Sequence, residues 1–217
     1  MTQAISWYED TYCYYFWKPH GIASSFGQWP CFLDVFKNIW SIQDTTLRQC
    51  MEHLDKTFGA ENEYGLLNRL DNDTWWLLYF AKTKTIKDTR KDLQKKWLIT
   101  KYYIADVTGD VWRNNKVVAY PIIHHPQSPD RMACISNTNT NIYATNTKKL
   151  YCETWIEKLY YDREKNYSCL LIYIQKWVRH QIRCHLSAIW CPIIWEKIYK
   201  KKKDTQFLHL WSIGVRV

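Results

Sequence analysis

The sequence predicts an α+β fold with a largely antiparallel sheet. Three observations lead to this prediction. Hydrophobic residues make up 47% of the 217 residues, enough to build a sizeable core. Predicted strands outnumber predicted helices, and few of them follow a strict β-α-β alternation. No linker rich in glycine, serine or proline interrupts the chain, so we expect a single domain over residues 1–217.

The first half of the chain alternates short apolar runs with two helical patterns. Asp44 suits a helix N-cap and Gly59 a helix end, and the apolar residues between them recur at helical spacing. Pro19 ends the first apolar run, because proline lacks the N–H that a strand donates. We predict strands at residues 12–16, 77–81 and 101–107, and helices at residues 44–58 and 85–96.

The second half is predicted to be mostly strands. Residues 151–159 and 168–175 resemble a strand pair joined by a turn at residues 161–166. Residues 178–189 show helical spacing, with Ile182, Leu186 and Ile189 facing inward. The segment 137–146 is rich in asparagine and threonine, and its local structure is left open. Further strands are predicted at residues 117–123, 131–136 and 207–215.

The charge balance favours a polyanionic partner. The chain carries a net charge of +9, and its basic residues cluster between Lys82 and Lys101 and at Lys200 to Lys203. Charge alone leaves an ordinary basic protein equally open. No apolar run approaches the roughly 18 residues of a membrane span, and no secretory signal begins the chain. We expect a cytoplasmic protein that does not contact membranes.

The cysteines do not predict a metal site. Eight are spread from Cys13 to Cys191, and none forms a Cys-x-x-Cys pair. In a reducing compartment they are expected to be small apolar core residues. His124 and His125 with the distant Cys134 are too loosely spaced for zinc, so a Cys/His metal protein is the weakest interpretation and no metal is expected.

The segment from Gly65 to Thr74 carries the most informative motif, Arg69-Leu70-Asp71 between apolar runs. Three further segments accompany it in the chain. These are Lys18-Pro19 with Gly21; Lys101-Tyr102-Tyr103-Ile104-Ala105-Asp106-Val107-Thr108-Gly109; and His180-Gln181-Ile182-Arg183, followed by Pro192 and Tyr199. Together and in this order they resemble the RluA family of RNA pseudouridine synthases, over nearly the whole chain.

The resemblance implies a catalytic domain with a central, mainly antiparallel mixed sheet flanked by helices. It implies isomerisation of uridine in ribosomal or transfer RNA, with Asp71 as the catalytic nucleophile. Arg183 would be the cation beside Asp71, Tyr103 would stack on the uracil, and Arg69 would order the loop or contact RNA. No cofactor is implied. Because the catalytic pattern begins at Tyr8, we expect no separate N-terminal RNA-binding domain. We expect a monomer.

Each residue also has a purely structural interpretation. Asp71 with Arg183 could be a buried ion pair, and Tyr103 could be one of many core aromatics among 16 tyrosines. The alternative function is a non-catalytic RNA-binding protein on the same fold. The chain also departs from the family pattern at Asn68, at Val178-Arg179 and at Glu196, where many relatives carry His, Arg-Thr and Asp.

Tryptophan stands where the family motifs carry glycine. The chain has 13 tryptophans and only six glycines, against an average glycine content of about 7%. Glycine serves where a backbone needs a positive φ or a close approach, and tryptophan serves neither need. One hypothesis is that the gene uses UGA for glycine; the alternative is genuine substitution. The positions are Trp75, Trp76, Trp177, Trp190 and Trp195.

Overall fold

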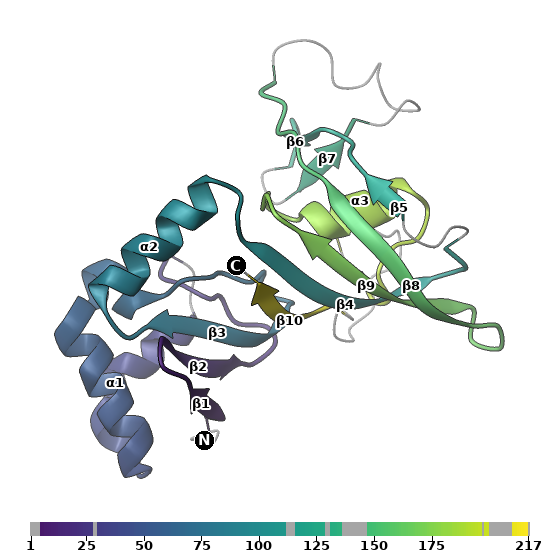
Figure 1. The fold of residues 1–217 in the computed structure, drawn as a ribbon. Coiled ribbons are helices and arrows are strands. Elements are labelled where there is room, and N and C mark those ends of the chain that lie inside the picture. Colours follow the sequence, from purple (N-terminus) through teal and green to yellow (C-terminus); the bar gives the residue numbers. More distant parts are fainter. Residues whose placement is uncertain are drawn as a thin grey trace. The chain divides into compact units, whose positions relative to one another are not determined.

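The computed structural model describes residues 5–27, 30–111, 116–128, 131–135, 147–196, 198–199 and 210–216. The chain divides into two compact units, Met1–Leu98 and Ile99–Val217. Both combine strands with helices, which confirms the predicted α+β class (Figure 1). The prediction that all 217 residues act as one domain stays a prediction.

A three-stranded antiparallel sheet forms one side of the first unit. Its order is β1-β2-β3, and Tyr15 of β2 lies opposite Tyr79 of β3. The strands predicted at 12–16 and 77–81 are confirmed, although β3 begins earlier. The short first strand was not predicted. The strands are β1 (Trp7–Glu9), β2 (Cys13–Lys18) and β3 (Trp75–Ala81).

Helices pack beside this sheet and enclose an aromatic core. The Asp44 carboxylate accepts hydrogen bonds from the Thr46 and Leu47 N–H groups, so it caps α1 as predicted. Phe16 and Phe80 meet edge to face, with ring centroids 5.2 Å apart. The helix predicted at 85–96 is also confirmed, as α2. The helical elements are η1 (Phe32–Ser41), α1 (Thr45–Phe58), η2 (Ala60–Gly65) and α2 (Lys84–Lys95).

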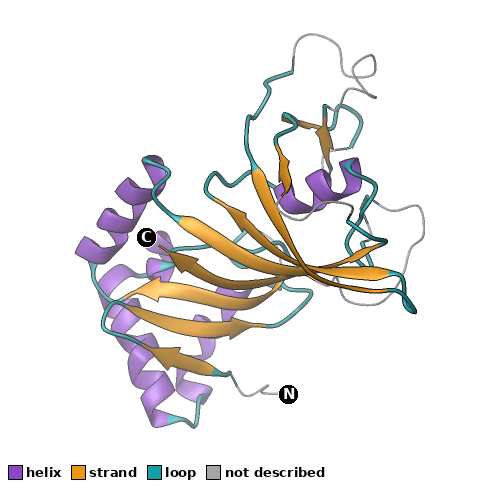
Figure 2. Cartoon of the chain, turned by 45° about the vertical axis from the view of Figure 1, so that its right-hand side comes forward, coloured by secondary structure: helices purple, strands orange, loops and turns teal. Residues whose placement is uncertain are grey.

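The second unit contains a five-stranded antiparallel sheet in the order β10-β4-β9-β8-β5 (Figure 2). Burial alternates along β4, which brings Tyr103, Ala105 and Val107 onto the core face. The predicted strand pair with its turn is confirmed as β8 and β9. The strands are β4 (Thr100–Thr108), β5 (Lys116–Val118), β8 (Thr154–Asp162), β9 (Tyr167–Ile174) and β10 (Leu210–Arg216).

The single strand predicted at 117–123 is wrong, because two strands share that segment. β5 ends at Val118 and pairs with β8, whereas β6 (Ile122–His124) pairs with β7 (Met132–Cys134) in a separate two-stranded sheet. Pro121 lies between them, and proline cannot donate to a ladder. The strand predicted at 131–136 corresponds to β7.

The helix predicted at 178–189 begins later than expected, as α3 (Gln181–Ala188). His180 has a left-handed backbone (φ 54°), and the Val178 N–H donates to the side-chain Oε1 of Gln181. The residues before Gln181 therefore form a turn. Ile182 and Leu186 face the core as predicted.

Several remaining expectations can be checked against the described residues. All eight cysteines are buried and free, as predicted. No helix in the described ranges is both long and apolar enough to cross a bilayer. The segment 137–146 and the basic run 200–203 lie outside the described residues, as do residues 207–209 of the last predicted strand.

Candidate functional site

The loop that carries Asp71 joins η2 to β3, and its first anchor is Asn68. This side chain is buried, and its amide forms two hydrogen bonds with β3. Nδ2 donates to the Leu77 carbonyl (3.0 Å), and Oδ1 accepts from the Tyr79 N–H (3.0 Å). Asn68 thus continues the backbone pairing of the strand and fixes the start of the loop.

Ser24 anchors the middle of the loop. Its buried hydroxyl donates to the Leu70 carbonyl (2.9 Å) and accepts from the Leu70 N–H (2.8 Å). One hydroxyl therefore satisfies both backbone groups of the residue immediately before Asp71. A buried backbone group without a partner is costly, so this contact holds Leu70 in one place.

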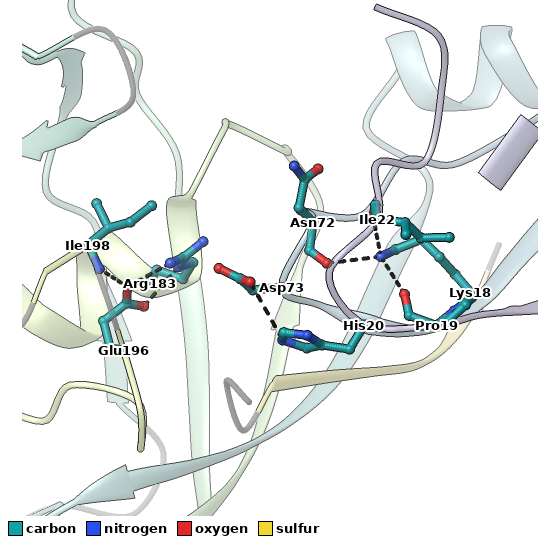
Figure 3. Close-up of polar contacts among 9 residues, drawn as sticks. All are labelled: Lys18, Pro19, His20, Ile22, Asn72, Asp73, Arg183, Glu196 and Ile198. Carbon is teal, nitrogen blue, oxygen red and sulfur yellow. Dashed lines mark hydrogen bonds and ion pairs between the residues drawn. The ribbon is translucent and has the colours of Figure 1, made fainter. Parts of the chain in front are cut away.

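Lys18 anchors the far side of Asp71. Its side chain is fully buried, and Nζ donates to the carbonyls of Pro19 (3.1 Å), Ile22 (2.8 Å) and Asn72 (3.1 Å) (Figure 3). The Gly21 N–H also donates to the Asn72 carbonyl (2.9 Å). Burial lowers the pKa of Lys18 to about 8, and the negative charges of Asp71 and Asp73 oppose this effect.

Asp71 itself lies half-buried at the turn that these anchors define. Its backbone carbonyl accepts from the Thr74 N–H (2.9 Å), which closes the turn. Asp73 lies 3.6 Å from Nε2 of His20. The Arg69 side chain is 57% exposed, and its guanidinium binds both carboxylate oxygens of Glu63. Arg69 thus ties the loop to η2.

In the second unit, Arg183 on α3 forms a buried ion pair with Glu196. Arg183 Nε donates to Oε2 (2.8 Å) and Nη2 donates to Oε1 (2.6 Å), and both side chains are almost inaccessible to solvent (Figure 3). Oε1 also accepts from the Ile198 N–H (2.9 Å). This two-pronged geometry fixes the plane of the guanidinium.

Tyr199 extends this cluster, which we call the Arg183 cluster: Arg183, Glu196, Tyr199 and His180. The Arg183 guanidinium carbon lies 5.9 Å from the centre of the Tyr199 ring. The Tyr199 hydroxyl accepts from the Met132 N–H (2.9 Å) and lies 3.1 Å from Nδ1 of His180. The cluster therefore joins α3 and β7 through polar contacts.

His185, on the same helix, has a structural role. Nε2 lies 2.9 Å from the Tyr120 carbonyl and must donate to it, so Nδ1 accepts from the Thr154 hydroxyl (2.8 Å). Burial lowers the pKa of His185 to about 4, which keeps the ring neutral near pH 7. Gln181 also donates to Thr154 and to the Glu153 carbonyl, so α3 is fastened to β8.

Tyr103 lies in the middle of β4, opposite Ile172 of β9, and is 5% exposed. It packs in the same core cluster as Ile182 and Leu186, the α3 residues on either side of Arg183 in sequence. One face of α3 therefore packs against the core that contains Tyr103.

The four predicted site residues are thus divided between the units. Asp71 and Arg69 share a loop of the first unit, and Tyr103 and Arg183 belong to the second. The predicted pairing of Asp71 with Arg183 stays a prediction; within the second unit, the carboxylate that binds Arg183 is Glu196. Sequence reasoning did not identify Lys18, Ser24 or Glu196 as positioning residues, although Lys18 and Glu196 lie within recognised motifs.

No three histidine, cysteine, aspartate or glutamate side chains come together as a metal site in the part of the chain that the structure describes. The polar residues of both regions are engaged instead in anchoring backbone or pairing with each other.

Comparison with known proteins identifies the family. The family model described as RNA pseudouridylate synthase matches residues 12–188, well over half of the chain. Two human proteins of known structure share the fold. RNA Pseudouridylate Synthase Domain Containing 1 has a TM-score of 0.70 at 16% identity, covering 98% of this chain and 78% of the other. Domain Containing 4 has a TM-score of 0.66 at 17% identity, covering 96% and 82%.

Two curated relatives are similar in sequence. An uncharacterized RNA pseudouridine synthase of Chloroflexus aurantiacus is 28% identical over 166 residues, which are 74% of this chain and 48% of the relative. Ribosomal large subunit pseudouridine synthase D of Nitrosomonas europaea is 28% identical over 162 residues, or 69% and 43%. The chain thus spans about half the length of these relatives. From the match across both units, together with the four motifs, we conclude that the chain belongs to the RNA pseudouridylate synthase family, in its RluA branch.

Proposed function

We propose that the chain isomerises uridine to pseudouridine in ribosomal or transfer RNA, that residues 1–217 act as one catalytic domain, and that Asp71 is the nucleophile. The observation that carries this proposal is the anchoring of the Asp71 loop. Ser24 and Lys18 bind its backbone on the two sides of Asp71, and the Asn68 side chain joins the start of the loop to the backbone of β3. A fixed backbone under a carboxylate is what nucleophilic attack requires.

The reaction moves the ribose from one ring atom of uracil to another. The bond between N1 and C1′ breaks, a bond between C5 and C1′ forms, and a proton leaves C5 while N1 gains one. A carboxylate that bonds covalently to the substrate divides this change into easier steps. In the proposal an oxygen of Asp71 attacks either C1′ of the ribose or C6 of the ring, and both routes regenerate the free carboxylate.

The other three predicted residues take supporting roles in the proposal. Arg183, whose guanidinium is oriented by Glu196, is the cation that favours the charged form of the Asp71 carboxylate. Tyr103 stacks on the flipped uracil and helps to move a proton. Arg69 orders the loop through Glu63 rather than contacting the reacting base.

The charge distribution supports RNA as the partner. The net charge is +9, and α2 carries a run of cations on a helix with no buried residue. Lys87 donates to the Asn62 carbonyl and Arg90 lies over the Tyr79 ring, so both side chains are engaged with the protein. Lys91 and Lys95 are exposed, and their pairs with Asp88 and Asp92 one turn away are surface contacts that a phosphate can replace, which makes these two lysines the stronger candidates for phosphate contact. One relative is named as acting on the ribosomal large subunit, which makes ribosomal RNA the first substrate to test.

The test is pseudouridine formation on unmodified ribosomal and transfer RNA, comparing the chain with its Asp71→Asn variant. Asn keeps the size of the side chain but cannot act as a carboxylate nucleophile. We expect loss of all activity with unchanged RNA affinity and an unchanged melting temperature. The assay is repeated with glycine at the five motif tryptophans, so that a defect caused by these residues is separated from the role of Asp71.

Two results would contradict the proposal. Activity that survives in Asp71→Asn would show that another group does the chemistry. RNA binding without isomerisation, in both the chain and its glycine version, would favour the non-catalytic RNA-binding alternative. Asp71→Glu serves as a control, because it retains a carboxylate but moves it, and we expect it to bind RNA normally with strongly reduced activity.

A further inference from the structure

Three tryptophans have a backbone conformation that suits glycine. The φ angles are 58° at Trp97, 64° at Trp190 and 59° at Trp195. Within the described residues, seven non-glycine residues have a positive φ, and three of them are tryptophan, which supplies only 13 of the 217 residues. A side chain with a Cβ atom is crowded in this region, whereas glycine adopts it freely. Chance placement does not explain this concentration.

Two of these tryptophans end helices in the same way. After α2, the Trp97 N–H donates to the Gln94 carbonyl (3.1 Å) and the Leu98 N–H donates to the Leu93 carbonyl (3.0 Å). After α3, the Trp190 N–H donates to the Ser187 carbonyl (3.1 Å) and the Cys191 N–H donates to the Leu186 carbonyl (3.0 Å). This paired pattern is the Schellman motif, whose left-handed position is usually occupied by glycine.

The chain does use glycine for left-handed positions elsewhere. Gly59 ends α1 with a φ of 68°, and five of the six glycines in the sequence have a positive φ. Glycine is therefore scarce in this chain, and almost all of its glycines occupy positions with a positive φ. The positive φ that ends α1 is thus at a glycine, whereas the positive φ that follows α2 and α3 is at a tryptophan.

Trp195 occupies a tight turn rather than a helix end. The Glu196 N–H donates to the Ile193 carbonyl (3.1 Å), which makes Trp195 the third residue of a four-residue turn. A positive φ at this position is what gives type II turns their preference for glycine. Glu196 is the fourth residue of this turn, so the turn determines the position of the carboxylate that binds Arg183.

Burial does not compensate for the strained backbone at the helix ends. The Trp190 side chain is 86% exposed and Trp97 is 46% exposed. Apolar surface that stays in water contributes little to stability. A tryptophan here therefore carries the cost of the left-handed backbone without the usual gain from burying a large ring.

We propose that Trp97, Trp190 and Trp195 are glycines in the protein that the cell makes, because their codons are UGA and are read there as glycine. Two of the three were already singled out by the motifs, whereas Trp97 is identified by its conformation alone. Trp177 has no positive φ, and Trp75 and Trp76 lie in β3, so for these three the motifs remain the support. The inference depends on backbone geometry and is independent of the proposed function.

The deciding measurement is mass spectrometry of peptides from the protein isolated from its source cells, read alongside the codons of its gene. We expect UGA at all three positions and glycine in the corresponding peptides. Tryptophan in the native peptides would overturn the inference at each position where it is found, and so would a UGG codon.

A stability series tests the geometric premise. For each of the three positions, glycine and alanine variants are compared in a background with glycine at the other two, so that a folded protein is available. Alanine removes the ring but keeps the Cβ atom. We expect the glycine variant to have a folding equilibrium constant about fivefold or more above that of the alanine variant.

Trp40 is the matched control. Its exposed fraction, 80%, is similar to that of Trp190, but it lies in η1 and does not have a positive φ. Here the order should reverse, with Trp40→Gly less stable than Trp40→Ala by about two- to fivefold. Equal stability of glycine and alanine at positions 97, 190 and 195 would show that these sites do not require glycine, and the premise would fail.

Discussion

The Asp71 loop and the Arg183 cluster are both held in place by buried charge, but they use it differently. Lys18 directs its ammonium at three backbone carbonyls, so the loop is fixed through its backbone. The Arg183 guanidinium donates two hydrogen bonds to the carboxylate of Glu196. The hydrogen bonds of Lys18 are distributed over three backbone carbonyls, whereas both of these hydrogen bonds of Arg183 go to one side chain. The Arg183 cluster should therefore be more sensitive to a single substitution.

The largest effect is expected from Glu196→Ala. The substitution leaves the Arg183 guanidinium buried without its partner, which should lower the free energy of unfolding by about 3 to 5 kcal/mol. Urea unfolding measures the loss. Glu196→Asp keeps a carboxylate and should recover most of it. The exposed pair of Lys158 and Asp110 is the matched control: Asp110→Ala should cost less than about 1 kcal/mol. Equal losses would show that burial does not distinguish the two pairs.

Lys18→Met should have the next largest effect. Three carbonyls lose their donor, at a cost of about 2 to 3 kcal/mol in unfolding free energy, because removing the buried charge offsets part of the loss. In the proposed enzyme, activity should fall by more than the loss of folded protein explains, since the Asn72 end of the loop is released. A variant that is destabilised but fully active would show that the loop does not need this anchor.

Lys18 also predicts a pH dependence. Its folded pKa, about 8, lies below the ordinary value of 10.5, so the unfolded chain binds more protons between these pH values. The contribution of Lys18 to stability should therefore rise with pH across this window. The neutral amine has only two hydrogens for three carbonyls, so isomerisation should decline as pH rises through about 8. A pH–rate profile of the Lys18→Met variant should lack that decline.

Ser24→Ala should have a smaller effect in the same loop. Leu70 loses the partner of both its N–H and its carbonyl, which should cost about 1 to 2 kcal/mol of unfolding free energy. Ser41→Ala is the matched control, because its hydroxyl binds one carbonyl at an exposed position and should change stability by less than about 0.5 kcal/mol. Thermal unfolding of the two variants separates them.

The smallest effect is expected from Arg69→Ala. The Arg69 side chain is 57% exposed, and exposed ion pairs contribute less than about 1 kcal/mol to stability. RNA affinity measured on the same variant decides between the two roles predicted for Arg69. Unchanged affinity agrees with an ordering role through Glu63, whereas weaker binding with normal stability would show a contact with RNA.

Local sequence signals predicted the elements whose ends are set by nearby residues. Helix α1 was found because Asp44 and Gly59 mark its two ends and the apolar residues between them repeat at helical spacing. The hairpin of β8 and β9 was found because its turn and both strands are contiguous. The start of α3 was missed, since the left-handed His180 is stabilised by contacts outside its own turn.

The sequence named candidate site residues but not the contacts that anchor them. The family motifs drew attention to Asp71, Tyr103 and Arg183, but nothing in the sequence shows that Lys18 reaches the Asn72 carbonyl or that Arg183 binds Glu196. Such partners lie at long or irregular separations in the chain and are chosen by tertiary packing. Periodicity and capping rules describe only neighbours, so they could not identify these contacts.

The segment that follows α3 returns to β4, and this connection bears on how the second unit folds. Thr108 donates to the Pro192 carbonyl, Ile194 donates to the Asp106 carbonyl, and Val107 bridges to Ile193. These contacts join residues far apart in the chain, whereas the β8–β9 hairpin closes over a short turn. Contacts that close long loops form late, because the chain loses the entropy of loop closure before it gains the stabilisation of the contacts. We therefore expect the hairpin to assemble first, and the return segment with its Arg183 helix to dock last and to open most readily in native-state hydrogen exchange.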